Sequence, residues 1–174
     1  MKKLLVMAVM MLSSVGAFAQ YYRGITTVQP RVGMNVSTVD YGNWKVGVAA
    51  GVEFQHQLSK SFALSEGIMY STQGNKNKHK RWNPGYINVP VTISCYVAQG
   101  LALKAGVQPG VMVVKDGTKG EQIFDFSIPV GFSYEYENIV FDARYNIGTT
   151  YVFKHTDHGC NNVIQVTVGY KFRI

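Results

Sequence analysis

The side chains best suited to metal binding stand together near the end of the 174-residue chain. His155 and His158 flank Asp157 in a short polar segment. Imidazole and carboxylate are zinc ligands, but nothing in this segment predicts a helix that would fix their spacing. We therefore expect a solvated loop here, and we predict neither a metal nor another cofactor.

His56 and His79 are the candidate bases for nucleophilic catalysis. A catalytic triad needs a hydroxyl nucleophile and an acid within hydrogen-bond reach of the histidine. The spacing of the sequence places no serine beside either histidine. We therefore predict that the chain is not an enzyme.

A basic cluster precedes Trp82 and consists of Lys76, Lys78, Lys80 and Arg81. Such a cluster can hold phosphate groups, with the Trp82 indole at the level of lipid headgroups. The alternative is a solvated loop tip. The net charge of +7 is too small and too scattered to indicate nucleic acid.

Residues 1–19 have the layout of a secretory signal peptide. Lys2 and Lys3 form a basic start, residues 4–12 are apolar, and the segment ends in Ala17-Phe18-Ala19. This apolar run is too short for a membrane helix, which needs about 20 residues. We predict cleavage before Gln20, which leaves residues 20–174 as the folded domain.

The remaining chain shows period-two alternation of apolar and polar residues, which predicts β-strands. We expect eight strands, an even number, near 31–38, 44–56, 62–72, 87–97, 101–113, 124–136, 139–153 and 164–174. Short connections near Lys60, Gln99 and Glu137 alternate with longer polar ones, as in bacterial outer-membrane barrels.

The two faces of these strands differ. One is bulky and aromatic, and the other is polar and carries Gly33, Gly47, Gly51, Gly67, Gly106, Gly110, Gly131, Gly148 and Gly169. Glycine weakens an exposed strand, whereas small residues fit the narrow lumen of an eight-stranded barrel. We therefore predict an all-β, eight-stranded antiparallel up-and-down barrel with its apolar face in lipid and its lumen filled by side chains. A soluble lipocalin-like barrel, with the apolar face inside, is the alternative fold.

Charged residues on the glycine-bearing face nearly balance in sign. Because buried charges need partners, we predict a lumenal ion-pair network. Its predicted members are Arg31, Lys45, Glu53, Lys104, Asp125, Glu135, Asp142, Arg144, Lys171 and Arg173. Glu66 breaks the pattern, since it falls in phase with the apolar face. We expect a β-bulge to turn it inward, and a place near the membrane interface is the alternative.

Aromatic residues near the strand ends, including Trp44, Tyr86, Tyr134 and Phe172, are expected to form the interfacial girdles. Cys95 and Cys160 fall near opposite ends of the predicted barrel. A disulfide needs Cα atoms within about 7 Å, so we expect no bridge between them.

Several short stretches resemble the PorT-like, or OmpA-like, outer-membrane β-barrel family of Gram-negative bacteria. They include Arg31-Val32-Gly33-Met34-Asn35-Val36-Ser37, Leu64-Ser65-Glu66-Gly67-Ile68-Met69-Tyr70-Ser71, Tyr86-Ile87-Asn88-Val89-Pro90, Ala105-Gly106-Val107-Gln108-Pro109-Gly110, Ala143-Arg144-Tyr145-Asn146 and Gly169-Tyr170-Lys171-Phe172. The end of the chain, Thr167-x-Gly169-x-x-Phe172-x-Ile174, resembles the signal that such barrels present to their insertion machinery, although its last residue is Ile where an aromatic is commoner.

The resemblance implies an integral outer-membrane barrel and leaves its role open. We expect a non-conducting structural or interaction element that acts through its outer loops and turns. A component of a protein secretion or assembly apparatus is the alternative, and a lipid-modifying enzyme is a second one. The expected partners are outer-membrane lipid, lipopolysaccharide at the basic cluster, and the barrel-assembly machinery during insertion.

Overall fold

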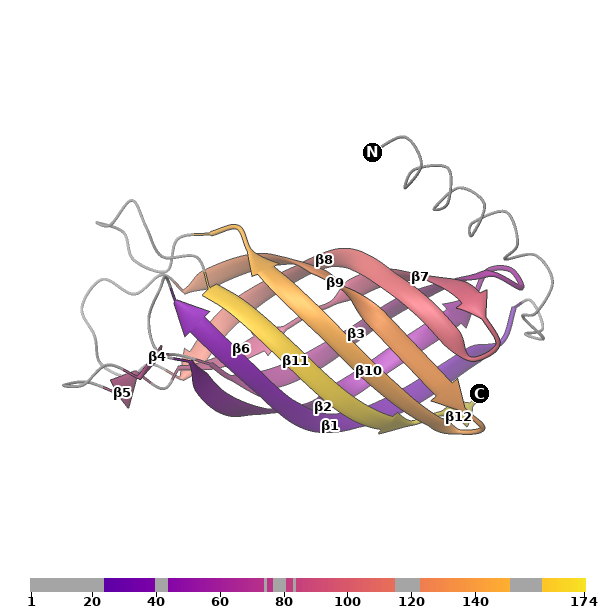
Figure 1. Ribbon diagram of the computed structural model, residues 1–174, viewed down its shortest axis with the longest axis horizontal. Helices are drawn as coiled ribbons and strands as arrows, with labels where there is room; N and C mark the ends of the chain where they lie inside the picture. The colour runs from indigo at the N-terminus through magenta and orange to yellow at the C-terminus, as the bar shows by residue number, and fades with distance from the viewer. Residues whose placement is uncertain are drawn as a thin grey trace, which may run out of the picture.

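The protein forms a closed, elongated β-barrel (Figure 1). A computed structural model describes residues 24–39, 44–73, 75–76, 81–82, 84–114, 123–150 and 161–174. Among these residues, no helix is long and apolar enough to cross a membrane. The predicted signal peptide, residues 1–19, lies outside the described residues.

Eight antiparallel barrel strands build the wall, as predicted. The elements are β1 (Thr26–Val39), β2 (Lys45–Gln57), β3 (Phe62–Thr72), β4 (Asn75–Lys76), β5 (Arg81–Trp82), β6 (Gly85–Asn88), β7 (Val91–Ala98), β8 (Leu101–Val114), β9 (Phe124–Tyr136), β10 (Ile139–Gly148), β11 (Asn161–Tyr170) and β12 (Phe172–Arg173). β6 with β7, and β11 with β12, each make one barrel strand. The barrel closes because β1 pairs with β11 and β12, so that the wall has no open edge to expose to lipid.

Two barrel strands that the alternation predicts as continuous are interrupted. Val89 and Pro90 separate β6 from β7, because proline cannot donate to the ladder. Lys171 separates β11 from β12. The first strand also begins at Thr26, earlier than predicted, and this adds Thr27 and Gln29 to the lumen.

The bulky face points outward and the small polar face points inward, which confirms the predicted orientation. Val32, Val48 and Ile68 point outward and are 65%, 58% and 63% exposed, respectively. The inward residues of the same strands, such as Asn35, Glu53 and Ser65, are buried. This arrangement is the reverse of a soluble barrel and fits a wall that contacts hydrocarbon.

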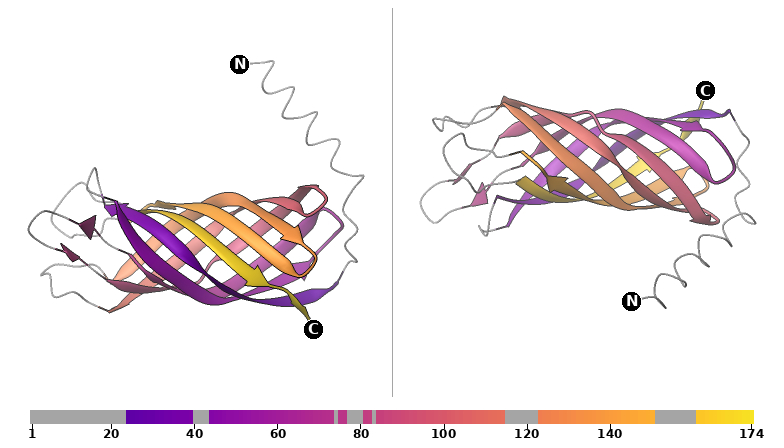
Figure 2. Two further views of the ribbon diagram at one scale, coloured as in Figure 1. Left: turned by 60° about the horizontal axis from the view of Figure 1, so that its bottom comes forward. Right: turned by 90° about the horizontal axis from the view of Figure 1, so that it is seen from above.

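The two ends of the barrel differ, as Figures 1 and 2 show. One end carries the tight connections at 58–61, 99–100 and 137–138, and the C-terminus lies there. We call this the turn end. At the other, the loop end, β4 and β5 pair as a small separate hairpin beyond the barrel. The two-residue turn after β9 places Glu137 at a positive φ of 53°, as hairpin turns of this length require.

Two predictions about the direction of a side chain need correction. Tyr86 is buried inside the barrel, in phase with Asn88, and so does not belong to a girdle. Glu66 points outward, with its side chain 56% exposed. No bulge turns it inward, because the β2–β3 ladder runs without a register shift from Ala49–Ser71 to Gln57–Ala63.

Candidate functional site

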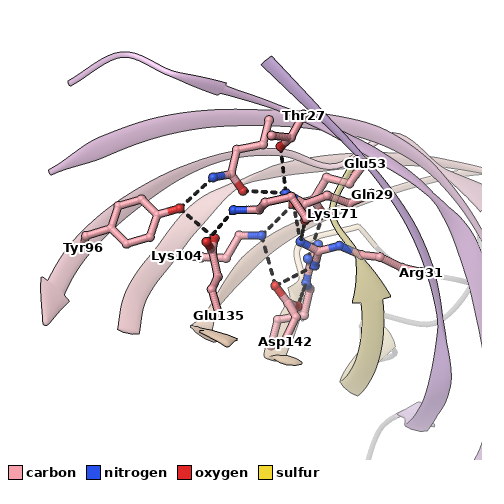
Figure 3. Close-up of polar contacts among 11 residues, drawn as sticks. Thr27, Gln29, Arg31, Glu53, Tyr96, Lys104, Glu135, Asp142 and Lys171 are labelled. Carbon is pink, nitrogen blue, oxygen red and sulfur yellow. Dashed lines mark hydrogen bonds and ion pairs between the residues drawn. The ribbon is translucent and has the colours of Figure 1, made fainter. Parts of the chain in front are cut away.

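The middle of the lumen holds a cluster of five charged side chains from four strands, all at most 6% exposed (Figure 3). This central cluster consists of Arg31 on β1, Glu53 on β2, Lys104 on β8, and Asp142 and Arg144 on β10. Lys104 Nζ lies 2.7 Å from Glu53 Oε1 and 3.0 Å from Asp142 Oδ2. Because β2 lies across the lumen from β8 and β10, these contacts join opposite walls.

The two arginines share the same pair of carboxylates. Arg144 donates from Nε to Asp142 Oδ1 at 2.6 Å and from Nη2 to Glu53 Oε2 at 3.0 Å. Arg31 Nη2 lies 3.1 Å from Glu53 Oε1, and Arg31 Nη1 lies 2.9 Å from Asp142 Oδ2. Three cations therefore face two carboxylates, and the cluster carries one excess positive charge.

Glycines make the room that these long side chains need. Arg31 sits in register between Gly51 and Gly169. A Cβ added at Gly169 would lie 2.7 Å from Arg31 Cγ. Gly131 is in register with both Lys104 and Arg144. The glycines on the inward face thus allow long charged residues to lie flat across a narrow lumen.

A second layer crosses the lumen nearer the turn end through a chain of hydrogen bonds. Arg31 Nη2 donates to Gln29 Oε1 (2.6 Å), and Gln29 Nε2 donates to Gln55 Oε1 (2.9 Å). Gln55 Nε2 donates to the Tyr96 hydroxyl (2.6 Å), which donates to Glu135 Oε1 (2.7 Å). Glu135 Oε2 also pairs with Lys171. This layer links the central cluster to strands on the far wall, as Figure 3 shows.

A third layer lies toward the loop end. Gln73 Nε2 and Asn88 Nδ2 both donate to Ser71 Oγ, at 2.7 and 2.9 Å. Asn161 Nδ2 on β11 donates to Gln73 Oε1. The side chains of this layer therefore also join opposite walls.

Seven of the ten predicted network residues form these ion pairs: Arg31, Glu53, Lys104, Glu135, Asp142, Arg144 and Lys171. Lys45 Nζ donates to the carbonyl of Gln73 at 3.0 Å. Asp125 accepts from Thr150 Oγ1 at 2.7 Å, and it joins no ion pair within the described ranges. Arg173 is exposed, because β12 carries it past Lys171 to the open turn end.

The neutral members of the second layer were not predicted from the sequence. Gln29, Gln55 and Tyr96 are each at most 4% exposed. Tyr96 falls on the same face of β7 as Thr92 and Ser94, and this alternation alone would have placed it in the lumen. The network was predicted from the balance of charged residues, and that criterion does not include neutral side chains such as these two glutamines and the tyrosine.

An outward polar group accompanies Glu66 near the turn end. His56 Nε2 lies 3.7 Å from Glu66 Oε1, and His56 Nδ1 is 3.0 Å from Thr26 Oγ1. His56 and Glu66 are 41% and 56% exposed on the bulky face. The alternative prediction for Glu66 was a place near the membrane interface. Its neighbours agree with that prediction, because Thr26 begins β1 and His56 lies near the end of β2.

The basic cluster is only partly described. Lys76 on β4 pairs in register with Arg81 on β5, whereas Lys78 and Lys80 lie outside the described residues. His79, His155, His158 and Cys160 also lie outside them. Cys95 is half-buried and forms no disulfide with any described residue. No group of three His, Cys, Asp or Glu side chains in the described ranges is arranged to hold a metal ion.

The family model described as "Outer membrane protein beta-barrel domain" matches residues 5–172. The chain belongs to this family. Its location is therefore the outer membrane. The resemblance to the wider family is thereby confirmed, and the PorT-like part of it stays a prediction. Comparison with curated protein sequences found no match.

Solved outer-membrane barrels share the fold. Neisserial surface protein A is 14% identical, with a TM-score of 0.58 over 84% of this chain and 97% of its own. Ail of Yersinia pestis is 12% identical, with a TM-score of 0.56 over 87% of this chain and 100% of its own. OprG from Pseudomonas aeruginosa is 10% identical, with a TM-score of 0.50 over 89% and 99%. At these identities the likeness concerns the architecture of the barrel.

Proposed function

We propose that this outer-membrane barrel is a non-conducting anchor that interacts through its outer loops and its periplasmic turns. The observation that carries the proposal is the set of three side-chain layers that join opposite walls of the lumen. An eight-stranded barrel is narrow, and its interior is of the size that side chains fill. With the lumen occupied in this way, the surfaces left for partners are the two ends and the lipid-facing wall.

Conductance of the purified full chain in a planar lipid bilayer tests the non-conducting part. We expect no stepwise currents beyond those of the bare bilayer. The variant Glu53→Gln/Asp142→Asn, which removes both carboxylates of the central cluster, serves as a comparison with a disrupted plug. Stable current steps from the wild-type protein would overturn the proposal.

The outer loops are proposed to bind the phosphates of lipopolysaccharide through Lys76, Lys78, Lys80 and Arg81. The support is that β4 and β5 bring Lys76 and Arg81 into register beyond the loop end of the barrel. Replacing all four residues by Gln should weaken binding to lipopolysaccharide micelles and reduce its salt dependence. Lys60→Gln, at the turn end, is the matched control and should leave binding unchanged.

The interaction partner can be sought by crosslinking in intact cells, from both ends of the barrel. Neighbours recovered from the outer loops or turns support the anchor role. If deletion of the gene blocks protein export, the chain serves the secretion apparatus instead. We also propose that residues 1–19 are cleaved as a signal peptide, which N-terminal sequencing of the mature protein tests by a start at Gln20.

A further inference from the structure

A row of inward-facing residues runs around the lumen at the level of Arg144. The ladder pairs Arg144 with Gln165, Gln165 with Asn35, and Asn35 with Gly47. Directly paired residues on one face of a sheet have Cβ atoms about 5 Å apart. Gly131 on one side and Gly47 on the other bound the row and contribute no side chain. Three polar side chains from three adjacent strands therefore face one part of the lumen together.

Each of these three side chains has a buried donor without a protein partner among the described residues. The donors are Arg144 Nη1, Gln165 Nε2 and Asn35 Nδ2. The side chains are 4%, 3% and 0% exposed. Buried donors of native proteins nearly always have a partner, so three adjacent donors without one indicate a bound group. We call Arg144, Gln165 and Asn35 the donor row.

The charge near the donor row is positive. The ion pairs of Arg144 use its Nε and Nη2, and its Nη1 takes part in neither of them. Within the central cluster, Arg31, Lys104 and Arg144 face only Glu53 and Asp142. The second-layer pair of Lys171 and Glu135 is neutral as a whole. A water molecule could satisfy the donors, but it would leave the excess positive charge uncompensated in a region of low dielectric constant.

We propose that the donor row binds a small monovalent inorganic anion of the size of chloride. One negative charge balances the central cluster, whereas a divalent phosphate would reverse its sign. Arg144 Nη1 supplies a charge-assisted hydrogen bond, and the two amides complete a set of donors on one side of the ion. Asn35 has both terminal amide atoms unpartnered within the described chain, so it can rotate to donate. The site lies within the barrel, apart from the basic cluster of the outer loops.

Bromide is the direct probe, because it replaces chloride and scatters anomalously. Crystals of the full chain grown in bromide should show an anomalous peak within hydrogen-bond distance of Arg144 Nη1 and Gln165 Nε2. In solution, the urea midpoint of the protein in detergent micelles should rise when chloride or bromide replaces gluconate at constant ionic strength. Gluconate serves as the comparison because it carries the same charge on a much larger organic anion.

Two glutamine variants separate binding from a general loss of packing. Gln165→Leu removes a donor of the row and should raise the half-saturating chloride concentration tenfold or more. Gln108→Leu is the matched control, since Gln108 is an equally buried lumenal glutamine that donates to Ser127. It should keep the chloride response. If Gln165→Leu fails to fold, Asn35→Leu takes its place in the same comparison.

Three results would overturn the proposal. One is a bromide peak confined to exposed lysines, which would mean an adventitious ion only. Another is a donor row occupied by water in crystals that contain bromide. The third is an equal chloride response of the Gln165→Leu and Gln108→Leu variants.

Discussion

Oε2 of Glu53 on β2 lies 3.0 Å from Nη2 of Arg144 on β10, although 91 residues separate them in the sequence. The contact spans the lumen and exists only because the barrel closes. It ties the N-terminal strands to the C-terminal strands through a pair that is almost completely buried. Such pairs do little to stabilise a fold when intact, but the loss of one partner leaves a buried charge that is no longer balanced.

Glu53→Gln should therefore destabilise the barrel strongly. The substitution keeps the shape of the side chain but leaves Arg31, Lys104 and Arg144 with Asp142 as their sole acidic partner in the central cluster. We expect a loss of about 3–5 kcal/mol in the free energy of unfolding, measured by urea titration in lipid vesicles. Glu137→Gln makes the same chemical change at an exposed turn and should cost no more than about 0.5 kcal/mol. Equal effects of the two variants would contradict a structural role for the central cluster.

The outward face of the barrel should tolerate a charged substitution poorly, although its residues are exposed. Val48 is 58% exposed, and in a water-soluble protein Val48→Lys would be nearly neutral. In a bilayer we expect it to cost about 2–4 kcal/mol, because a lysine on the lipid face must lose its hydration. Gln99→Lys, at a turn, is the control and should be neutral. A neutral Val48→Lys in vesicles would place this part of β2 outside the hydrocarbon.

Glu66 allows the reverse substitution, in which a charge is removed from the outward face. Its carboxylate faces outward with His56 3.7 Å away, beyond hydrogen-bond distance. Because exposed ion pairs contribute about 0–1 kcal/mol and a carboxylate beside lipid is costly, Glu66→Leu should leave stability unchanged or raise it by about 1 kcal/mol. The same vesicle assay applies. A marked loss, absent when His56 is already replaced by Gln, would show that the pair is a stabilising contact.

Strand number, closure and the orientation of the two faces follow from local pattern, and the sequence was sufficient for them. Alternation assigns each residue to a face, and the glycines on one face identify the lumen. The structure shows a second reason for those glycines. A Cβ at Gly106 or Gly131 would lie 2.0 or 2.2 Å from a carbonyl oxygen of the next strand, so the close approach of backbones also requires them.

The choice of partners within the lumen could not be predicted in the same way. Which side chains meet across the barrel depends on the stagger of all eight strands, and no single strand contains that information. Alternation also extends past the point where a strand leaves the barrel, so it places Arg173 in the network although this residue is exposed at the turn end. The expected bulge at Glu66 came from the cost of a carboxylate in lipid, but the ladder between β2 and β3 is regular there.

Tyr96 tests the second layer, which charge balance alone did not reveal. Its hydroxyl accepts from Gln55 Nε2 and donates to Glu135 Oε1, so Tyr96→Phe removes one contact of each. We expect a loss of about 1–3 kcal/mol in vesicle unfolding, because a buried amide and a buried carboxylate each lose a hydrogen bond. Tyr134→Phe makes the same change on the outward face, where the side chain is 46% exposed, and should cost less than about 0.5 kcal/mol. If both variants unfold alike, the hydrogen-bonded chain from Gln29 to Glu135 does not contribute to holding the walls together.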